Sequence, residues 1–149
     1  MSFRQFSGLV LAASLFVPAL GVADPGLMQR ASPYPVHETL DRLEGVLREK
    51  GVKVFARIDH GGEAQSAGLA LKPSQLLIFG NPKAGTPLMQ TAPRIGLDLP
   101  MKVLAWQGDE GGTWVTWNSP DYLITRHGLP GDAAKPLGAI SGLLDAALK

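Results

Sequence analysis

Two short stretches of the sequence carry the residues best suited to chemistry, and each of them follows or contains an expected strand. His60 comes directly after the run VKVFARID and precedes two glycines. An imidazole in that position could act as a general base, a proton shuttle or a metal ligand, or it could simply cap or pack against the adjoining loop. The second stretch, LLIFGNPKAGTPLM at residues 76–89, contains Asn81, Lys83 and Thr86 among two glycines and two prolines. Its outline is close to that of a phosphate-binding loop.

The details of this second stretch argue against nucleotide binding. Gly80 and Gly85 have the spacing of a G-x-x-x-x-G-K-[ST] loop, but Thr86 follows Gly85 directly, without the lysine that reaches the terminal phosphates. Lys83 lies inside the loop instead, and Pro82 removes one of the backbone N–H groups that would surround an anion.

A structural interpretation accounts for most of the same residues. Asn81 and Thr86 are typical helix-capping residues, and Pro82 and Pro87 follow them at the first helical position. Lys83 has no role in that interpretation. A second interpretation therefore stays open, in which N–H groups of the turn after Thr86 bind a small anion or carboxylate with the help of Lys83.

Other kinds of chemistry find less support in the residues. The chain has no cysteine, which excludes thiol redox chemistry and iron–sulfur clusters, and no G-x-S-x-G motif. A metal site would require His60 and His127 to meet in space, so we predict neither a metal nor a cofactor. His127, at the end of an expected helix, suits a structural role there, and His37 lies on the polar face of another helix.

Hydrophobic periodicity and turn residues predict the elements that position these side chains. Helices are expected from residue 36 to the glycine at 51, over 63–67, from two successive starts within 81–93, over 120–127 and over 137–148. Strands are expected over 52–59, 75–79, 100–106 and 113–118, the last two as a hairpin across which Trp106 and Trp114 could pair. This order predicts an α+β fold, a two-layer sandwich with helices on one face of a mostly antiparallel sheet.

The N-terminus predicts the compartment. Residues 1–23 combine one arginine, an apolar run and the small residues Gly21-Val22-Ala23, as in a secretory signal peptide. Residues 24–31 read as a linker or edge segment, and residues 32–149 as a single domain. We expect a secreted protein, periplasmic in a Gram-negative cell. No second apolar run of spanning length follows, so no membrane association is expected after cleavage.

The charge balance bears on the partners. The chain has 14 Lys and Arg against 13 Asp and Glu, and loss of Arg4 with the signal peptide makes the two numbers equal. No run of like charge is longer than two, which argues against nucleic acid as a partner.

Three stretches in this order, VFARIDH, LLIFGNPKAGTPLM and LDLPMKVLAWQ, resemble a known family, the domain of unknown function numbered 302. The resemblance covers about residues 32–130. It implies a compact α+β domain, a two-layer sandwich similar in topology to one half of the TATA-box binding protein, and assembly as a dimer. It implies no reaction and no residue roles, because the family has none assigned. The matching positions are Asp59, His60, Gly80, Asn81, Pro82, Lys83, Gly85, Thr86, Pro87, Leu88 and Lys102.

From these observations we expect a protein that binds a small ligand, for which an anion is one candidate, or a protein partner. The site should lie where the strand ends at His60 and at Gly80-Asn81 come together with Lys83 and Lys102. An alternative is a small hydrolase- or isomerase-like enzyme in which His60 is the general base and either lysine holds an anionic substrate. A further alternative is a structural domain that dimerises through its sheet or its last helix.

Overall fold

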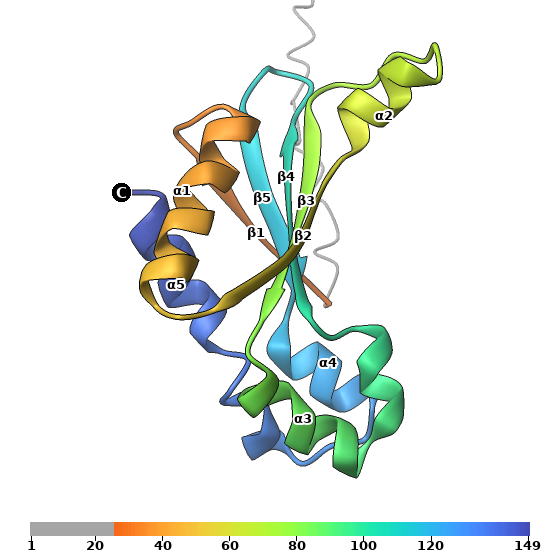
Figure 1. The fold of residues 1–149 in the computed structure, drawn as a ribbon, viewed down its shortest axis with the longest axis vertical. Helices are drawn as coiled ribbons and strands as arrows, with labels where there is room; N and C mark the ends of the chain where they lie inside the picture. The colour runs from red at the N-terminus through yellow and green to blue at the C-terminus, as the bar shows by residue number, and fades with distance from the viewer. Residues whose placement is uncertain (1–25) are drawn as a thin grey trace, which may run out of the picture.

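The computed structural model describes residues 26–149, so the expected signal peptide lies outside the described residues. Figure 1 shows the arrangement of the elements. Along the chain they are β1 (Leu27–Ser32), α1 (Val36–Glu49), β2 (Lys53–Asp59), α2 (His60–Ser66), β3 (Ser74–Gly80), α3 (Pro82–Thr91), η1 (Pro93–Leu97), β4 (Met101–Gln107), β5 (Thr113–Asn118), α4 (Pro120–Arg126), η2 (Gly131–Ala134) and α5 (Ala139–Ala147).

The strands form one antiparallel sheet in the order β1-β5-β4-β3-β2. β1 is an edge strand, and it pairs with β5 along its whole length, from Leu27 opposite Asn118 to Ser32 opposite Thr113. The segment interpreted as a linker or edge therefore contributes a strand to the sheet, and the domain extends at least from residue 27. The hairpin of β4 and β5 is confirmed, with Trp106 directly opposite Trp114.

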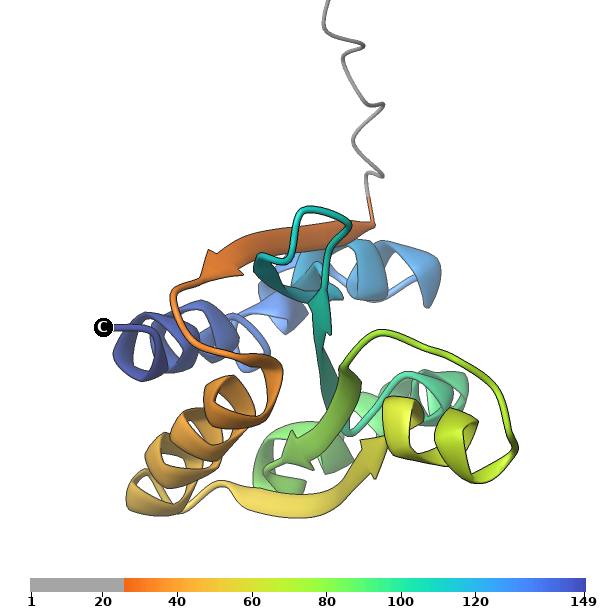
Figure 2. The ribbon, with the colours of Figure 1, turned by 90° about the horizontal axis from the view of Figure 1, so that it is seen from above.

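Helices α1 and α5 pack against each other and cover one face of the sheet (Figures 1 and 2). At the lower end of the sheet in Figure 1 lie α3 and α4, while α2 extends from the opposite end. This is the predicted α+β sandwich with helices on one face. The described part of the chain contains no helix that is long and apolar enough to cross a membrane.

The two faces of the sheet differ in burial because side chains alternate along each strand. In β4, Val103 and Ala105 point toward the helices and are fully buried, whereas Leu104 and Trp106 on the other face are half-buried. Burying a leucine or valine contributes about 2 kcal/mol each. Leucines from α1 and α5 complete the core: Leu40, Leu43, Leu47 and Leu144.

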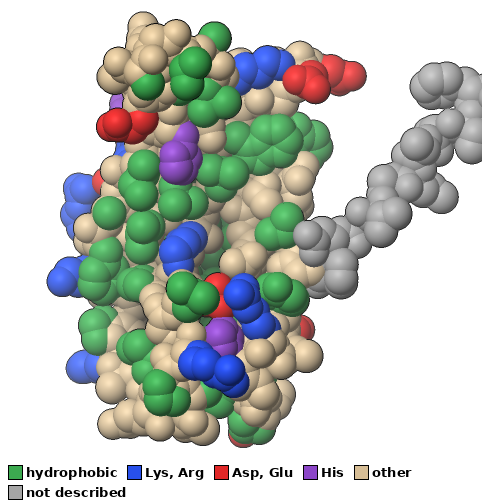
Figure 3. Space-filling view, turned by 90° about the vertical axis from the view of Figure 1, so that its right-hand side faces the viewer, with side chains coloured by type: hydrophobic (Ala, Val, Ile, Leu, Met, Phe, Trp, Pro, Cys, Tyr) green, Lys and Arg blue, Asp and Glu red, His purple; other side chains and the backbone are tan. Residues whose placement is uncertain are grey.

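The second face, here called the open face, has no helix over its middle in the described structure. Figure 3 views the molecule from this side and shows hydrophobic side chains between polar ones. Register places Leu76 opposite Leu104 and opposite Ile58, and Ile78 opposite Lys102. Apolar members of the open face include Ile58, Leu76, Ile78, Leu104, Trp106 and Trp114.

Two local predictions need correction. The helix expected over 63–67 begins at His60 instead, because the Asp59 side chain accepts a hydrogen bond from the Gly62 N–H and caps the first turn. The glycines after His60 are therefore helical and not a flexible loop. The second expected helix start, at Thr86, is also wrong, since α3 runs through it with Pro87 inside the helix.

Candidate functional site

The structure does not bring the predicted site together. β2 and β3 are antiparallel, so Asp59 lies opposite Gln75 whereas Gly80 lies opposite Lys53 at the other end of the pair. The chain enters α2 at His60 and α3 after Asn81, which places these two residues at opposite ends of the sheet. The prediction of a shared pocket was wrong because it treated both residues as following strands that end at the same edge. That geometry belongs to parallel strands.

His60 occupies the first position of α2 and its side chain is exposed. No hydrogen bond or ion pair involves its imidazole in the described residues. A general base needs a group that orients it and a place for substrate beside it. The surroundings of His60 supply neither.

A broad cleft of about 1190 Å³ lies near His60, between the start of α1, helix α2 and the hairpin loop. Asp59, Gly61 and Gly62 contribute to its wall. Next to it, Arg57 donates hydrogen bonds to Asp41 (2.6 Å), Glu44 (3.1 Å) and Gln75. These contacts join β2 to α1 and satisfy the hydrogen-bonding capacity of the guanidinium. We therefore interpret the cluster of Arg57, Asp41 and Glu44 as structural.

A second cavity, here called the β3 pocket, lies at the other end of the sheet, where β3 runs into α3. Its volume is about 300 Å³ and its wall is mostly apolar. α3 supplies one side, the start of β2 a second and α5 a third. The lining residues are Val52, Phe55, Phe79, Gly80, Asn81, Pro82, Ala84, Gly85, Met89, Leu99, Pro100, Met101, Pro136, Leu137, Ala139, Ile140 and Leu143.

Much of the stretch that first suggested a phosphate loop forms the wall of this pocket. Glycine suits position 80 because the segment before β4 approaches closely. A Cβ on Gly80 would lie 3.3 Å from the Pro100 Cβ. Pro82 and Ala84 line the pocket from the first turn of α3, and Gly85 from the next. The stretch thus shapes an apolar cavity and does not form a phosphate-binding loop.

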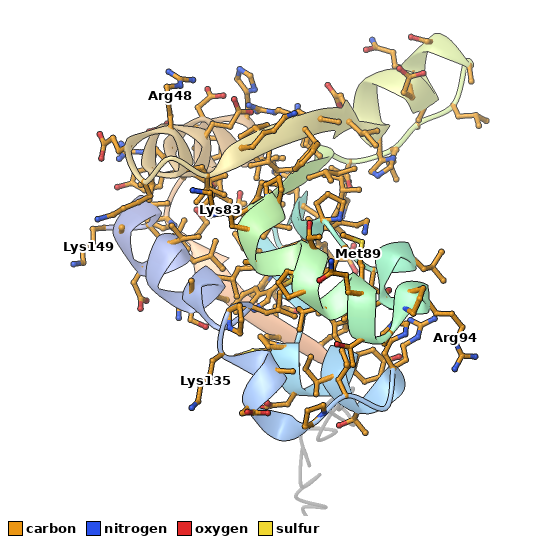
Figure 4. The ribbon with its side chains drawn as sticks, turned by 60° about the horizontal axis from the view of Figure 1, so that its bottom comes forward. Arg48, Lys83, Met89, Arg94, Lys135 and Lys149 are labelled. Atoms are coloured by element: carbon orange, nitrogen blue, oxygen red, sulfur yellow. The ribbon has the colours of Figure 1, made fainter. Side chains whose placement is uncertain are left out.

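The candidate ligand-binding residues of this stretch differ in placement. Asn81 lines the pocket, and its side-chain oxygen accepts a hydrogen bond from the Lys83 N–H at 2.9 Å, so it caps α3 as predicted. Thr86 is exposed within α3 and is not among the lining residues. Figure 4 shows Lys83 at the start of α3, on the side that faces α1 and α5.

Lys102, the remaining candidate, lies on the open face and is half-buried. Its ammonium donates hydrogen bonds to the backbone oxygens of Asp98 (3.0 Å) and Pro100 (3.2 Å). These bonds hold the turn that enters β4. Lys102 therefore has a structural role in this arrangement and lies away from His60 and outside the wall of the β3 pocket.

A contact that was not predicted from the sequence joins Asp98 and His127. The His127 Nε2 lies 2.6 Å from the Asp98 carboxylate, with the two side chains only 7% and 11% exposed, and Arg126 approaches the other carboxylate oxygen at 3.4 Å. His127 caps the end of α4, as predicted, but nothing in the sequence links it to a residue 29 positions earlier. The pair ties α4 to the turn before β4 and leaves the imidazole little room to meet a substrate.

The histidines and carboxylates also bear on metal binding. Residues 26–149 contain no group of three or more His, Asp or Glu side chains that could hold a metal ion. His60 and His127 are at opposite ends of the sheet, the former after β2 and the latter beside the turn into β4.

Comparison with known proteins agrees with the motif-based resemblance. The family model "Domain of unknown function DUF302" matches residues 28–147. The chain belongs to this family. The crystal structure of an uncharacterized conserved DUF302 protein from Bacillus stearothermophilus superposes with a TM-score of 0.69 over 83% of this chain and 96% of that one, at 22% sequence identity. At that identity the likeness concerns the fold alone.

Relatives in sequence from Brucella carry a functional name. The chain is 45% identical over 136 residues to the fluoride-specific ion channel FluC 1 of Brucella suis biovar 1 (strain 1330), covering 90% of this chain and 53% of the relative. The fluoride-specific ion channel FluC 2 of Brucella melitensis biotype 1 matches at the same identity, with 50% of its length covered. The chain thus spans about half the length of these relatives.

Proposed function

We propose that the protein is a binding domain that holds a small, largely apolar molecule in the β3 pocket. The observation that carries this proposal is the pocket itself, whose wall includes most of the GNPKAG segment of the family stretch. Ligand pockets are typically concave, mostly apolar and at least about 300 Å³ in volume. A volume of about 300 Å³ suits a ligand of modest size.

The pocket can be tested with a neutral probe, 1-hexanol, by two-dimensional amide NMR of the protein without residues 1–23. Binding should shift the amides of Gly80, Gly85 and Ala139, which line the pocket. Replacing Ala84 by leucine puts added side-chain volume at the pocket wall and should weaken binding about tenfold or more, as expected for the loss of a small ligand's contacts.

Ala64→Leu provides the matched control. Ala64 is a half-buried alanine of a helix, like Ala84, but it lies in α2 at the other end of the sheet. This variant should bind hexanol as the wild type does. Circular dichroism melts of both variants report whether they fold. Equal hexanol affinity in a folded Ala84→Leu protein would contradict the proposal.

The enzyme alternative has less support from the geometry. It requires His60 as general base and either Lys83 or Lys102 beside it, but His60 lies at the opposite end of the β2–β3 pair from Lys83. Lys102 is already bonded to two backbone oxygens. An assay that detects turnover abolished by His60→Ala would restore this alternative.

A second candidate function, self-association, is favoured by the open face. Six apolar side chains from four strands meet there without a covering helix in the described structure, and patches of that kind often mark interfaces. We propose that a second copy of this chain covers the face, sheet against sheet. Such packing keeps both apolar surfaces from water.

The Brucella relatives suggest a setting for the domain. Their names concern fluoride channels, and this chain matches about half of each. Residues 26–149 hold no helix that could span a membrane, so we propose that channel activity resides in the part of those relatives that this chain does not match. Secretion to the periplasm, from the signal pattern at residues 1–23, remains our proposal for localisation.

A further inference from the structure

We propose that the ligand of the β3 pocket is an amphipathic monocarboxylate, with its apolar body in the pocket and its carboxylate at the mouth. This inference rests on the proposed function, because it names the chemical class of the molecule that the same pocket would take. Three features carry it: three lysines adjacent to lining residues, the two helix starts in the pocket wall, and the absence of acidic side chains among the lining residues.

Three lysines adjoin the pocket wall. Lys83 stands between Pro82 and Ala84, which both line the pocket, and Lys135 precedes the lining residue Pro136. Figure 4 shows Lys83 at the start of α3 and Lys135 in the segment that leads into α5. Within residues 26–149 the ammonium groups of these two lysines have no hydrogen-bond or ion-pair partner.

The third lysine touches a lining side chain. The Lys53 ammonium lies 4.7 Å from the centroid of the Phe55 ring, and Phe55 lines the pocket. Lys53 is also opposite Gly80 in the sheet, at the point where β3 leaves for α3. Lys53 is therefore a neighbour of two residues of the pocket wall, Phe55 and Gly80. None of the three lysines is itself a lining residue, but each adjoins one, so their positive charge favours a ligand carboxylate at the mouth.

Two helices of the wall begin at the pocket. Asn81, Pro82 and Ala84 belong to the start of α3, and Leu137, Ala139 and Ile140 to the start of α5. The N-terminal end of a helix carries a partial positive charge and prefers anions. α5 begins without a hydrogen bond from a side-chain cap, and the Gly138 and Ile140 N–H groups at its start donate to backbone oxygens of the preceding turn. The helix start therefore contributes its partial positive charge and not free N–H donors.

The acidic side chains that could oppose this field are absent from the wall. Every lining side chain except Asn81 is apolar or glycine. The nearest acidic residue in sequence is Asp98, beside Leu99, and its carboxylate is bound to His127 and Arg126. A carboxylate head at the mouth is thus attracted by the lysines and repelled by no lining group. A cationic head would be disfavoured for the same reason.

The apolar body is needed as well as the charge. The exposed lysines alone would attract many anions weakly, with the attraction screened by salt. The enclosed part of the site offers leucine, isoleucine, methionine and phenylalanine side chains, which gain nothing from a small inorganic anion. Specificity therefore requires both parts in one molecule.

The test compares hexanoate, 1-hexanol and hexylammonium, which share one apolar chain, by the same NMR titration. Hexanoate should bind about fivefold more tightly than hexanol, a difference typical of a charge-assisted contact at an exposed position, and hexylammonium most weakly. The hexanoate advantage should shrink between about 20 mM and about 500 mM NaCl, because salt screens exposed charges.

Lys83→Ala should lower the affinity for hexanoate about threefold and leave that for hexanol unchanged. Lys72→Ala is the matched control, since Lys72 is an exposed lysine at the far end of the sheet, paired with Asp109 at 2.8 Å. It should change neither affinity.

The outcomes separate the two proposals. If none of the three probes shifts the amides of the pocket, the proposed function itself fails. If hexanol and hexanoate bind equally at low salt and Lys83→Ala alters neither, the pocket stands as a ligand site and the carboxylate class is overturned. Tightest binding of hexylammonium would overturn the carboxylate class in the same way.

Discussion

At the scale of single residues, Asp98 and His127 form the most buried contact between two ionisable side chains in the described structure. Removing the imidazole by His127→Ala leaves a carboxylate that is 11% exposed with only the longer 3.4 Å contact to Arg126. Losing one partner of such a pair costs the desolvation of the other, about 2–4 kcal/mol. Urea unfolding of the variant should show this loss as a lower midpoint.

His60→Ala is the natural control for that measurement. It makes the same chemical change at an exposed histidine whose imidazole has no partner in the described residues. Surface changes of this kind usually alter stability by less than about 0.5 kcal/mol. Equal losses in the two variants would show that the 2.6 Å contact contributes nothing to folding.

Asp109 offers a test of electrostatics. A hydrogen bond and charge attraction from Lys72 hold the pKa of the Asp109 carboxyl below its ordinary value. A carboxyl with a depressed pKa in the folded protein stabilises it at neutral pH, and this contribution is lost as pH falls through the depressed value. Carbon-13 NMR titration should give a lower pKa for Asp109 in the wild type than in Lys72→Ala. An identical titration curve would show that the contact does not persist in solution.

The individual candidate residues show what sequence can and cannot predict. Capping by Asn81 depends on neighbours two positions away, and it was predicted correctly. The contact of Asp98 with His127 and the hydrogen bonds of Lys102 depend on how the turn before β4 packs against α4. No local pattern in the sequence reports that packing.

At the scale of elements, the start of α3 has both a structural and a binding role in our proposals. Asn81→Ala removes the acceptor of the Lys83 N–H and should cost about 1 kcal/mol of stability, the usual value for an N-cap. Asn81→Asp keeps a hydrogen-bond acceptor at this position and should retain most of the stability that the cap contributes. Thermal unfolding measures both variants, and a full loss in Asn81→Asp would mean that the amide group acts in some other way.

Element prediction succeeded where signals were strong and local. Gly51 and Gly128 adopt φ of +67° after α1 and α4, as expected for helix ends, and the hairpin places Trp106 opposite Trp114. It failed at His60 and Thr86. At His60, the Asp59 cap starts a helix that includes the two following glycines. At Thr86, α3 continues through Pro87, so the proline does not mark a new helix start.

At the scale of the whole molecule, the antiparallel direction of β2 and β3 explains why the predicted shared site does not form. The sequence predicted a mostly antiparallel sheet, and that prediction already implies that consecutive strands in a pair end at opposite edges. Because β2 and β3 are antiparallel, His60 and Asn81 lie at opposite ends of this strand pair. His60 is beside the broad cleft, and Asn81 lines the β3 pocket. The fold class was predictable, but the β3 pocket was not, because α5 completes it from the far end of the chain.

The open face is the feature that only the assembled sheet reveals, and it leads to a prediction about self-association. Leu104 lies near its centre, opposite both Leu76 and Thr116. If two copies pack sheet against sheet, the protein should elute as a dimer in size-exclusion chromatography with light scattering. Leu104→Glu should convert it to a monomer, because a desolvated carboxylate at the centre of the interface has no partner.

Leu97→Glu is the matched control for this experiment. Leu97 is a leucine of η1 that is 74% exposed and lies outside the sheet. It should remain dimeric and as stable as the wild type. A monomer at all concentrations of the wild type would remove the dimer proposal, and a dimer that survives Leu104→Glu would place the interface elsewhere.

The β3 pocket is formed by α3, α5 and the ends of β2 and β3, away from the centre of the open face. Hexanol binding should therefore be the same in the dimer and in the Leu104→Glu monomer, which makes the two functions separable within one domain.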